Sequence, residues 1–271
     1  MPTNPPTEPG PRTEGELLEE LRAGGPSLVA LSGGVDSAAV ALLAFRALGS
    51  EAFAVTLCGP AVAAEEVERA TTVAHRIGIR HAVVPVDPLA ESGYRSNPSN
   101  RCYFCRSVET RAVREWGTPR GIARYLDGVQ LDDLGEDRPG IVAMDEAGFH
   151  HPLVWARWHK TDVRSFARVA GLPNWDAPSD ACLASRIRHG QEVTVPLLGR
   201  IETAERGIRD RGFRRVRVRV EGDRARVEVD AAEVAKLASE PLASEVRTAL
   251  ERLGFTEVVL DPLGYRLRPG A

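Results

Sequence analysis

The sequence predicts an α/β protein with a doubly wound parallel sheet and a smaller α+β domain at its C-terminal end. Three observations support this fold class. Compact apolar runs alternate with helical segments along the first part of the chain, and the first of these runs ends directly at Gly33-Gly34. Beyond about Arg188, the pattern changes to a long helix followed by a β-hairpin. In such sheets, ligands bind at the carboxyl ends of the strands.

The first part of the chain supplies the alternating elements. We expect a short amphipathic helix at 16–23, strands at 27–31, 52–57, 81–86 and 124–128, and helices at 37–48, 65–77 and 160–170. Each predicted strand is a short run rich in apolar residues. The three longer helices stop at Gly49, Gly78 and Gly171, because glycine readily adopts the backbone conformation that ends a helix.

The last part of the chain has a different periodicity. A helix is expected at 195–211, strands at 216–220, 225–229 and 257–260, and two further helical stretches before the last strand. Polar and apolar residues alternate on both sides of a Glu-Gly-Asp turn, which is typical of a hairpin. We therefore predict a disordered tail at 1–14, a doubly wound α/β domain at 15–187, and a C-terminal α+β domain at 188–271 for substrate binding or oligomerisation.

Composition excludes several classes of protein. A formal net charge of -3 provides no long-range attraction to nucleic acid or anionic lipid, so a nucleic-acid partner is not expected. The segment up to Arg12 has five prolines and no apolar signal region, and no run approaches the roughly 18 apolar residues of a membrane span. Four cysteines without an export signal predict a cytoplasmic protein with reduced thiols.

The segment Ser32-Gly33-Gly34-Val35-Asp36-Ser37 lies between a predicted buried strand and a helix. Free backbone N–H groups and the helix dipole form an anion site there, and glycines let the backbone wrap around a phosphate. A carboxylate such as Asp36 repels phosphate unless Mg²⁺ bridges the two. Kinase-like and hydride-transfer readings lose support because the Gly-Lys-Ser/Thr and Gly-x-Gly-x-x-Gly signatures are absent. The alternative is a glycine turn that caps a helix.

This segment resembles the signature Ser-Gly-Gly-x-Asp-Ser of the PP-loop ATP pyrophosphatases. The resemblance implies that 15–187 is a PP-loop ATP pyrophosphatase domain with an adenine nucleotide alpha hydrolase-like fold. It also implies that Ser32, Gly33, Gly34, Asp36 and Ser37 hold the pyrophosphate of ATP, with Mg²⁺ on Asp36, while an acceptor oxygen is adenylated.

Further motifs resemble the LarE family over about residues 27–230. They are Asn100-Arg101-Cys102-Tyr103-Phe104-Cys105, Asp127-Gly128 with Asp132-Asp133-Leu134-Gly135, Arg138-Pro139-Gly140, and Pro178-Ser179-Asp180-Ala181-Cys182-Leu183-Ala184-Ser185-Arg186. The resemblance implies an ATP-dependent sulfurtransferase that converts a carboxylate of pyridinium-3,5-biscarboxylic acid mononucleotide into a thiocarboxylate. It also implies hexamers and cooperation with other proteins of nickel-pincer nucleotide cofactor biosynthesis. Val129-Gln130-Leu131 departs from the family's Thr-Asn-Ala, which affects the details of the substrate pocket.

Cys182 is the expected sulfur nucleophile, and two fates of the sulfur stay open. In one branch of the family, this cysteine forms a thioester and then loses its own sulfur, leaving dehydroalanine. In the other branch, three cysteines hold a 4Fe-4S iron-sulfur cluster whose fourth iron can carry sulfide; this chain has Cys102, Cys105 and Cys182. The cluster is the preferred hypothesis. Zinc is the alternative, with a fourth ligand from Cys58, His150, His151 or His159.

Arginines are the candidate ligands for the substrate phosphate. Arg215, Arg217 and Arg219 alternate along one predicted strand, so their side chains share a face. The resemblance favours Arg186, Arg217 and Arg219 for the phosphate, since guanidinium groups bind phosphate bidentately. The alternative is a solvated edge that prevents aggregation. Asp133, Glu205 and Glu228 match acids that bind metal in the family.

Three functions remain open at this stage. The preferred hypothesis is adenylation of a carboxylate with release of pyrophosphate, followed by replacement of AMP by sulfur. The same loop also serves tRNA thiolation and amide formation of the NAD or GMP synthetase type. A nucleotide-binding zinc module without catalysis is the third hypothesis.

Overall fold

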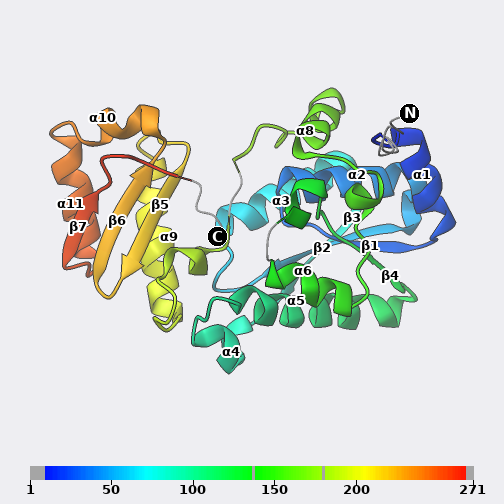
Figure 1. The fold of residues 1–271 in the computed structure, drawn as a ribbon, viewed down its shortest axis with the longest axis horizontal. Helices are drawn as coiled ribbons and strands as arrows, with labels where there is room; N and C mark the ends of the chain where they lie inside the picture. Colours follow the sequence, from blue (N-terminus) through cyan, green and yellow to red (C-terminus); the bar gives the residue numbers. More distant parts are fainter. Residues whose placement is uncertain (1–9, 136–137, 179–180, 267–271) are drawn as a thin grey trace, which may run out of the picture. The chain divides into compact units, whose positions relative to one another are not determined.

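The computed structural model describes residues 10–135, 138–178 and 181–266, and these form two compact units (Figure 1). The first unit contains the described parts of Met1–Cys58, Glu65–Val86 and Glu109–Ala177. The second unit contains the described parts of Gly59–Ala64, Asp87–Val108 and Pro178–Ala271. The division into domains at 15–187 and 188–271 stays a prediction.

A four-stranded parallel sheet forms the centre of the first unit. Its strands, in the order β3-β2-β1-β4, are β1 Ser27–Ala30, β2 Ala52–Cys58, β3 Arg80–Pro85 and β4 Arg124–Leu126. The chain continues from β1 to β2 on one side and later returns to β4 on the other. The carboxyl ends of β1 and β4 are therefore the switch point where doubly wound sheets bind ligands.

Helices cover both faces of this sheet (Figure 1). The first unit contains all or most of seven described helices. They are α1 Glu14–Ala23, α2 Val35–Leu48, α3 Ala64–Ile77, α5 Arg101–Gly117, α6 Pro139–Glu146, α7 Pro152–Trp155 and α8 Lys160–Val169. Buried side chains of α1, α2, α3 and α8 share one core with β1 and β2. Side chains of α5 and α6, with Leu28 and Val55 of the strands, form a second core.

The second unit is built on a three-stranded sheet in the order β5-β6-β7. Its strands are β5 Val216–Glu221, β6 Arg224–Val229 and β7 Glu257–Leu260, and its helices, besides the start of α5, are α4 Ser92–Arg95, α9 Val195–Arg209, α10 Val234–Leu237 and α11 Leu242–Arg252. β5 and β6 pair as an antiparallel hairpin, and β7 runs parallel to β6. One apolar core joins this sheet to α9 and α11.

Short 3₁₀ helices occur at several connections. They are η1 Gly49–Glu51, η2 Pro88–Ala90, η3 Thr118–Arg120, η4 Leu131–Gly135, η5 Leu183–Arg186 and η6 Ala231–Glu233. Within the described ranges, no helix combines the length and apolar character needed to cross a membrane.

The predicted fold class is confirmed, and every strand predicted from an apolar or alternating run is present. The 17-residue helix α5 was not predicted. Thr110 and Val113 are both buried, and Arg101 is buried on about the opposite face of the helix from Thr110, so no single apolar stripe marks it. Residues 1–9 of the predicted tail lie outside the described residues, whereas Thr13 and Glu16 form a capping box at the start of α1.

Candidate active site

The loop between β1 and α2 is shaped by its first glycine. Gly33 has φ +82°, a backbone conformation that side chains disfavour. A methyl group at this position would lie 2.8 Å from the carbonyl oxygen of Glu66 and 3.0 Å from the amide nitrogen of Ala70. Glycine is therefore required both by the turn and by the close approach of α3.

The two serines close the loop on itself. The hydroxyl oxygens of Ser32 and Ser37 lie 3.1 Å apart, and Ser37 also donates to the carbonyl of Gly34 over 3.1 Å. The amide of Gly34 donates to the hydroxyl of Ser32 over 3.3 Å. Gly34 caps α2 without any side-chain acceptor, so the first turn of this helix presents backbone N–H groups of the kind that bind anions.

Lys160, the first residue of α8, forms an ion pair with Asp36. The sequence predicted a helix from this residue but assigned no function to its ammonium group. The other carboxylate oxygen of Asp36, Oδ1, is buried and has no hydrogen-bond partner among the described residues. The loop thus combines a cation with a carboxylate oxygen that is free to accept a metal ion or a donor.

A buried carboxylate follows β4, next to this loop. Asp127 is 3% exposed and accepts a hydrogen bond from His151 Nδ1 over 2.8 Å, while His151 Nε2 lies 2.7 Å from Asp145. Burial by itself lowers the pKa of His151, but the hydrogen bonds and charges of Asp127 and Asp145 outweigh it and raise the pKa to about 9. This carboxylate–imidazolium–carboxylate group was not predicted, since Asp127 lies 24 residues before His151 and no periodic pattern connects the two.

The raised pKa of His151 predicts a pH-dependent stability. A folded-state pKa of about 9 against 6.5 means that the stabilisation is complete below pH 6.5 and is lost as the pH rises through about 9. We expect protonated His151 to contribute roughly 2 kcal/mol to the free energy of unfolding, and most of it to come from Asp127, because the exposed Asp145 contributes little. Urea unfolding of wild type and His151→Gln at pH 6.5 and 9.5 tests this expectation. Equal pH dependence in the two proteins would contradict it.

Gly128 brings the segment after β4 against the loop. A methyl group on Gly128 would lie 2.6 Å from the amide nitrogen of Ser37 and 2.9 Å from the carbonyl carbon of Asp36. Both are backbone atoms and cannot rotate away. The close contact between β4 and the first turn of α2 therefore depends on glycine.

Gly128→Ala is expected to lower the free energy of unfolding by about 2 kcal/mol and to weaken ATP binding, because the loop must shift. Gly199→Ala in α9 is the matched control, since no atom lies within 4 Å of its added methyl group. It should raise the stability by up to about 1 kcal/mol. Thermal unfolding and ATP titration measure both effects, and a Gly128→Ala protein as stable as wild type would refute the close contact.

The three cysteines predicted to take part in sulfur transfer, Cys102, Cys105 and Cys182, all belong to the second unit. Cys102 and Cys105 lie one turn apart at the start of α5, and Cys182 precedes η5. Cys105 and Cys182 both pack against the core of this unit. Burial raises the pKa of the Cys182 thiol, with a further rise from Cys102, against the charges of Arg101 and Arg186, which lower it.

Arg186 shapes the cysteine turn, which consists of Cys182 and the 3₁₀ helix η5. Its guanidinium is 3% exposed and forms two hydrogen bonds to Glu205, of 2.8 and 3.0 Å. The same group donates to the carbonyl of Cys182 over 3.1 Å. Glu205 in turn accepts from the backbone amide of Val218 in β5 over 2.9 Å. This buried pair ties the cysteine turn to α9 and to the hairpin; phosphate binding by Arg186 stays a prediction.

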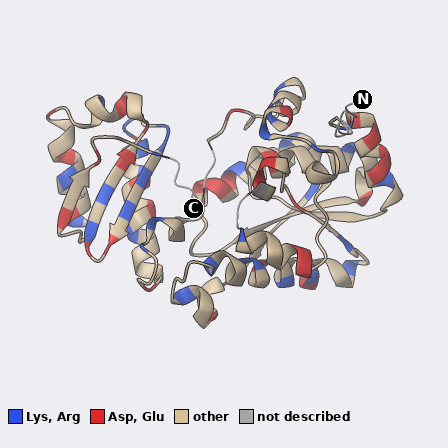
Figure 2. Ribbon diagram, viewed as in Figure 1, with Lys and Arg blue, Asp and Glu red and all other residues tan. Residues whose placement is uncertain are grey.

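The two strands of the hairpin carry basic and acidic residues (Figure 2), and the register places Arg217 opposite Glu228 and Arg219 opposite Arg226. Arg219 pairs with Glu228 over 3.1 Å, and Arg217 is buried with its guanidinium 5.7 Å from the ring centre of Tyr265. The two-residue turn after β5 fixes the register that brings Glu228 opposite Arg217, so this neighbour could have been found from the sequence. Phosphate binding by Arg217 and Arg219 stays a prediction.

The predicted metal-binding acids are paired with arginines. Glu205 and Glu228 belong to the second unit, while Asp133 belongs to the first and lies 2.8 Å from Arg138. Among the described residues, no three or more His, Cys, Asp or Glu side chains are arranged to hold one metal ion. Ser179 and Asp180 of the predicted motif lie outside the described residues.

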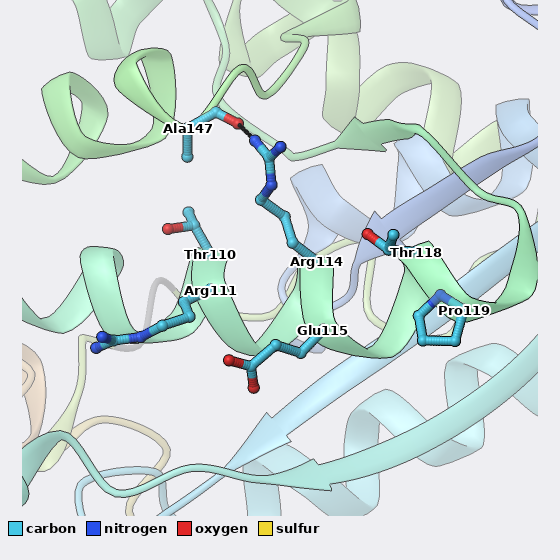
Figure 3. Close-up of a pocket in the computed structure, with 7 residues that line it drawn as sticks. All are labelled: Thr110, Arg111, Arg114, Glu115, Thr118, Pro119 and Ala147. Atoms are coloured by element: carbon cyan, nitrogen blue, oxygen red, sulfur yellow. Dashed lines mark hydrogen bonds between the residues drawn. The ribbon is translucent and has the colours of Figure 1, made fainter.

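A separate hollow of about 610 Å³ lies on the first unit (Figure 3). It is lined by Thr110, Arg111, Arg114, Glu115, Thr118, Pro119 and Ala147. Arg114 donates to the carbonyl of Ala147 over 2.7 Å. None of the predicted site residues contributes to this hollow.

Known proteins are similar to this chain in two ways, some over the part that contains the loop and others over most of its length. Residues 18–102 match the NAD synthase family model. An uncharacterized protein of Synechocystis sp. is 39% identical over 240 residues, which cover 89% of this chain and 90% of that protein. An NH(3)-dependent NAD(+) synthetase of Pyrococcus horikoshii is 40% identical over 164 residues, or 58% of this chain and 62% of the synthetase.

One relative is named for its product. The pyridinium-3,5-bisthiocarboxylic acid mononucleotide synthase of Lactiplantibacillus plantarum is 31% identical over 239 residues, which cover 88% of this chain and 86% of the synthase. This similarity extends well beyond the part matched by the NAD synthase model and includes the cysteine turn. The chain therefore belongs to the LarE family, that of the pyridinium-3,5-bisthiocarboxylic acid mononucleotide synthases.

Proposed function

We propose that this protein is an ATP-dependent sulfurtransferase. It adenylates a carboxylate of pyridinium-3,5-biscarboxylic acid mononucleotide and then replaces AMP by sulfur to form a thiocarboxylate. The observation that carries this proposal is the 31% identity, over most of both chains, to a synthase of the bisthiocarboxylic product. The phosphate loop and the buried cysteine turn support the two halves of the reaction.

The loop after β1 performs the first half. A substrate carboxylate oxygen attacks the α-phosphorus of ATP, forming an O–P bond while the bond from that phosphorus to pyrophosphate breaks. The leaving pyrophosphate is assigned to backbone N–H groups of the first turn of α2, beside the hydroxyl of Ser32, which accepts from the amide of Gly34. Lys160 lies next to the loop through its ion pair with Asp36 and neutralises further phosphate charge.

Asp36 suits a magnesium ion because its Oδ1 is buried without a hydrogen-bond partner among the described residues. An orphaned carboxylate oxygen costs free energy unless a cation or donor occupies it. Mg²⁺ prefers carboxylate and phosphate oxygens, and when bound it would neutralise the charge of the triphosphate. Asp133, which binds Arg138, is the weaker candidate ligand.

Cys182 performs the second half. Sulfur attacks the carbonyl carbon of the acyl adenylate, a C–S bond forms, and the C–O bond to AMP breaks. An anionic sulfur is the stronger nucleophile; burial raises the pKa of the Cys182 thiol, and the charges of Arg101 and Arg186 oppose that rise. The substrate phosphate is assigned to Arg217 and Arg219, with Arg186 fixing the cysteine turn through its bond to the carbonyl of Cys182.

The chain's donor set also suits a 4Fe-4S cluster. Cys102, Cys105 and Cys182 belong to one unit, and Cys102 and Cys182 are close enough for their charges to interact. A cluster holds its thiolates further apart than a single ion does, since each binds a different iron. When bound, such a cluster would supply an iron that can carry sulfide. The alternative, in which Cys182 gives up its own sulfur, needs Cys182 alone.

The remaining expectations follow from family membership. We propose a cytoplasmic homo-oligomer, a hexamer by family analogy, that acts with other proteins of nickel-pincer nucleotide biosynthesis. Amide formation of the NAD synthetase type is the second candidate because of the match at residues 18–102. That match covers the phosphate loop but ends at Cys102, and it gives no reason for the buried Cys182 turn. RNA thiolation lacks any supporting observation beyond the loop.

Exchange of radiolabelled pyrophosphate into ATP tests the adenylation step. We expect exchange only when the pyridinium biscarboxylic acid mononucleotide is present, because its carboxylate is the acceptor. Nicotinic acid adenine dinucleotide with ammonia serves as the competing substrate pair. Exchange that depends on the dinucleotide instead would refute the proposed substrate and favour the synthetase.

A further inference from the structure

Asn174 reaches the phosphate loop from the segment after α8. Its side chain is 3% exposed, and its Nδ2 donates a hydrogen bond of 2.8 Å to the carbonyl oxygen of Gly33. This contact was not predicted, since 141 residues separate the two partners. Asn174 touches no other part of the loop by a hydrogen bond among the described residues.

We propose that Asn174 is a positioning residue that fixes the peptide between Gly33 and Gly34 in the orientation that binds pyrophosphate. In a trans peptide, the carbonyl and the following N–H point in opposite directions. Holding the carbonyl of Gly33 toward Asn174 therefore turns the N–H of Gly34 the other way, toward the hydroxyl of Ser32 at the anion site, to which it donates over 3.3 Å. This inference rests on the proposed function, because it assigns a residue to the same ATP site.

This peptide needs such a restraint because both of its residues are glycines. Rotation of the peptide changes ψ of Gly33 and φ of Gly34, and neither has a side chain to resist the rotation. Gly33 is already at φ +82° and Gly34 at φ -73°. A rotated peptide would point a carbonyl oxygen at the phosphate, replacing an attractive contact by a repulsive one.

The atoms on either side of this peptide are fixed by other bonds. Ser37 donates to the carbonyl of Gly34 over 3.1 Å, and the amide of Ala38 binds the same oxygen over 3.1 Å. On the other side, Gly33 packs against the backbone of Glu66. Two hydrogen bonds act on the peptide itself: its carbonyl accepts from Asn174 over 2.8 Å, and its N–H donates to the hydroxyl of Ser32 over the longer distance of 3.3 Å. Asn174 therefore supplies the shorter of the two restraints.

Asn174 is itself held firmly. Its backbone carbonyl accepts from the amide of Ala177 over 3.1 Å, which closes a turn. Arg164 of α8 donates to the carbonyl of Trp175 over 3.2 Å and to that of Ala177 over 2.9 Å. The orientation of the Asn174 side-chain amide is also determined, because exchanging its Nδ2 and Oδ1 would place Oδ1 against the carbonyl oxygen of Gly33. Both ends of α8 therefore contact the loop region, Lys160 through Asp36 and the following turn through Asn174.

The test is the affinity of the purified full chain for magnesium pyrophosphate, measured by calorimetry well below the thermal midpoint of each variant. Asn174→Asp keeps the shape but places an oxygen against the carbonyl of Gly33, so the peptide should rotate. We expect about tenfold weaker binding or more. Asn174→Ala removes the donor without adding a charge and should weaken binding less.

Asn97→Asp is the matched control. Asn97 is also buried and donates through Nδ2 to backbone carbonyls, those of Arg188 and Gln191, but it belongs to the second unit. We expect it to lower the thermal midpoint and leave pyrophosphate affinity unchanged. A purely structural Asn174 would behave in the same way, and wild-type affinity in folded Asn174→Asp or Asn174→Ala overturns the proposal. Wild-type protein that binds no pyrophosphate contradicts the proposed function and, with it, this role.

Discussion

Replacing Cys182 by serine is expected to abolish thiocarboxylate formation while adenylation continues. The thiol is needed only after pyrophosphate has left, and the phosphate loop belongs to the other unit of the chain. Serine keeps the size of the side chain but is a much weaker nucleophile than a thiolate, and it cannot supply sulfur. Pyrophosphate exchange should therefore stay at the wild-type rate, while mass spectrometry of the product shows no sulfur.

Cys58→Ser is the matched control for this experiment. Cys58 ends β2 in the first unit and is half-buried, and none of the proposed steps uses it. We expect wild-type sulfur transfer from this variant. Cys102→Ser and Cys105→Ser separate the two fates of sulfur: both should lose transfer if three thiolates hold a cluster, and both should retain it if Cys182 gives up its own sulfur. Sulfur transfer by Cys182→Ser would contradict either route.

Replacing Asp36 by asparagine is expected to lower kcat/KM for adenylation by about a hundredfold or more. The amide keeps the shape of the side chain but removes the charge that pairs with Lys160 and that would hold magnesium. The loss should fall on adenylation, so a preformed acyl adenylate would still accept sulfur. Rates of substrate-dependent AMP formation across a series of magnesium concentrations measure the effect.

Asp162→Asn provides the control for charge and for helix stability. Asp162 lies in α8, two residues from Lys160, and accepts from the amide of His159 over 2.9 Å as part of a capping box. Its loss should cost about 1 kcal/mol of stability and leave adenylation unchanged. Equal adenylation rates in Asp36→Asn and Asp162→Asn would show that Asp36 does not act at the phosphates.

Sequence reasoning found the fold because the strands are apolar and the helices of the first unit mostly end at glycine. It found the phosphate loop for a related reason: Gly33 and Gly34 stand where a strand meets a helix, and that position alone places them at a ligand-binding edge. Such features are local in sequence. They can therefore be recognised without knowing which segments meet in space.

The contacts that organise the site are not local, which is why they were missed. Lys160 and Asn174 reach the loop from more than a hundred residues away, and His151 meets Asp127 through a turn that has no periodic signal. For the arginines, by contrast, the signal was local. Alternation predicted a shared face for Arg217 and Arg219, and the two-residue turn after β5 also sets the register that places Glu228 opposite Arg217.

The most direct test of the proposed function follows one oxygen atom. If the substrate carboxylate attacks ATP and sulfur then displaces AMP, the attacking oxygen leaves with AMP. A substrate labelled with ¹⁸O in its carboxylates should therefore yield AMP that carries one ¹⁸O for each thiocarboxylate formed, with unlabelled pyrophosphate. Unlabelled AMP, or ADP with phosphate as the products, would contradict adenylation of the carboxylate.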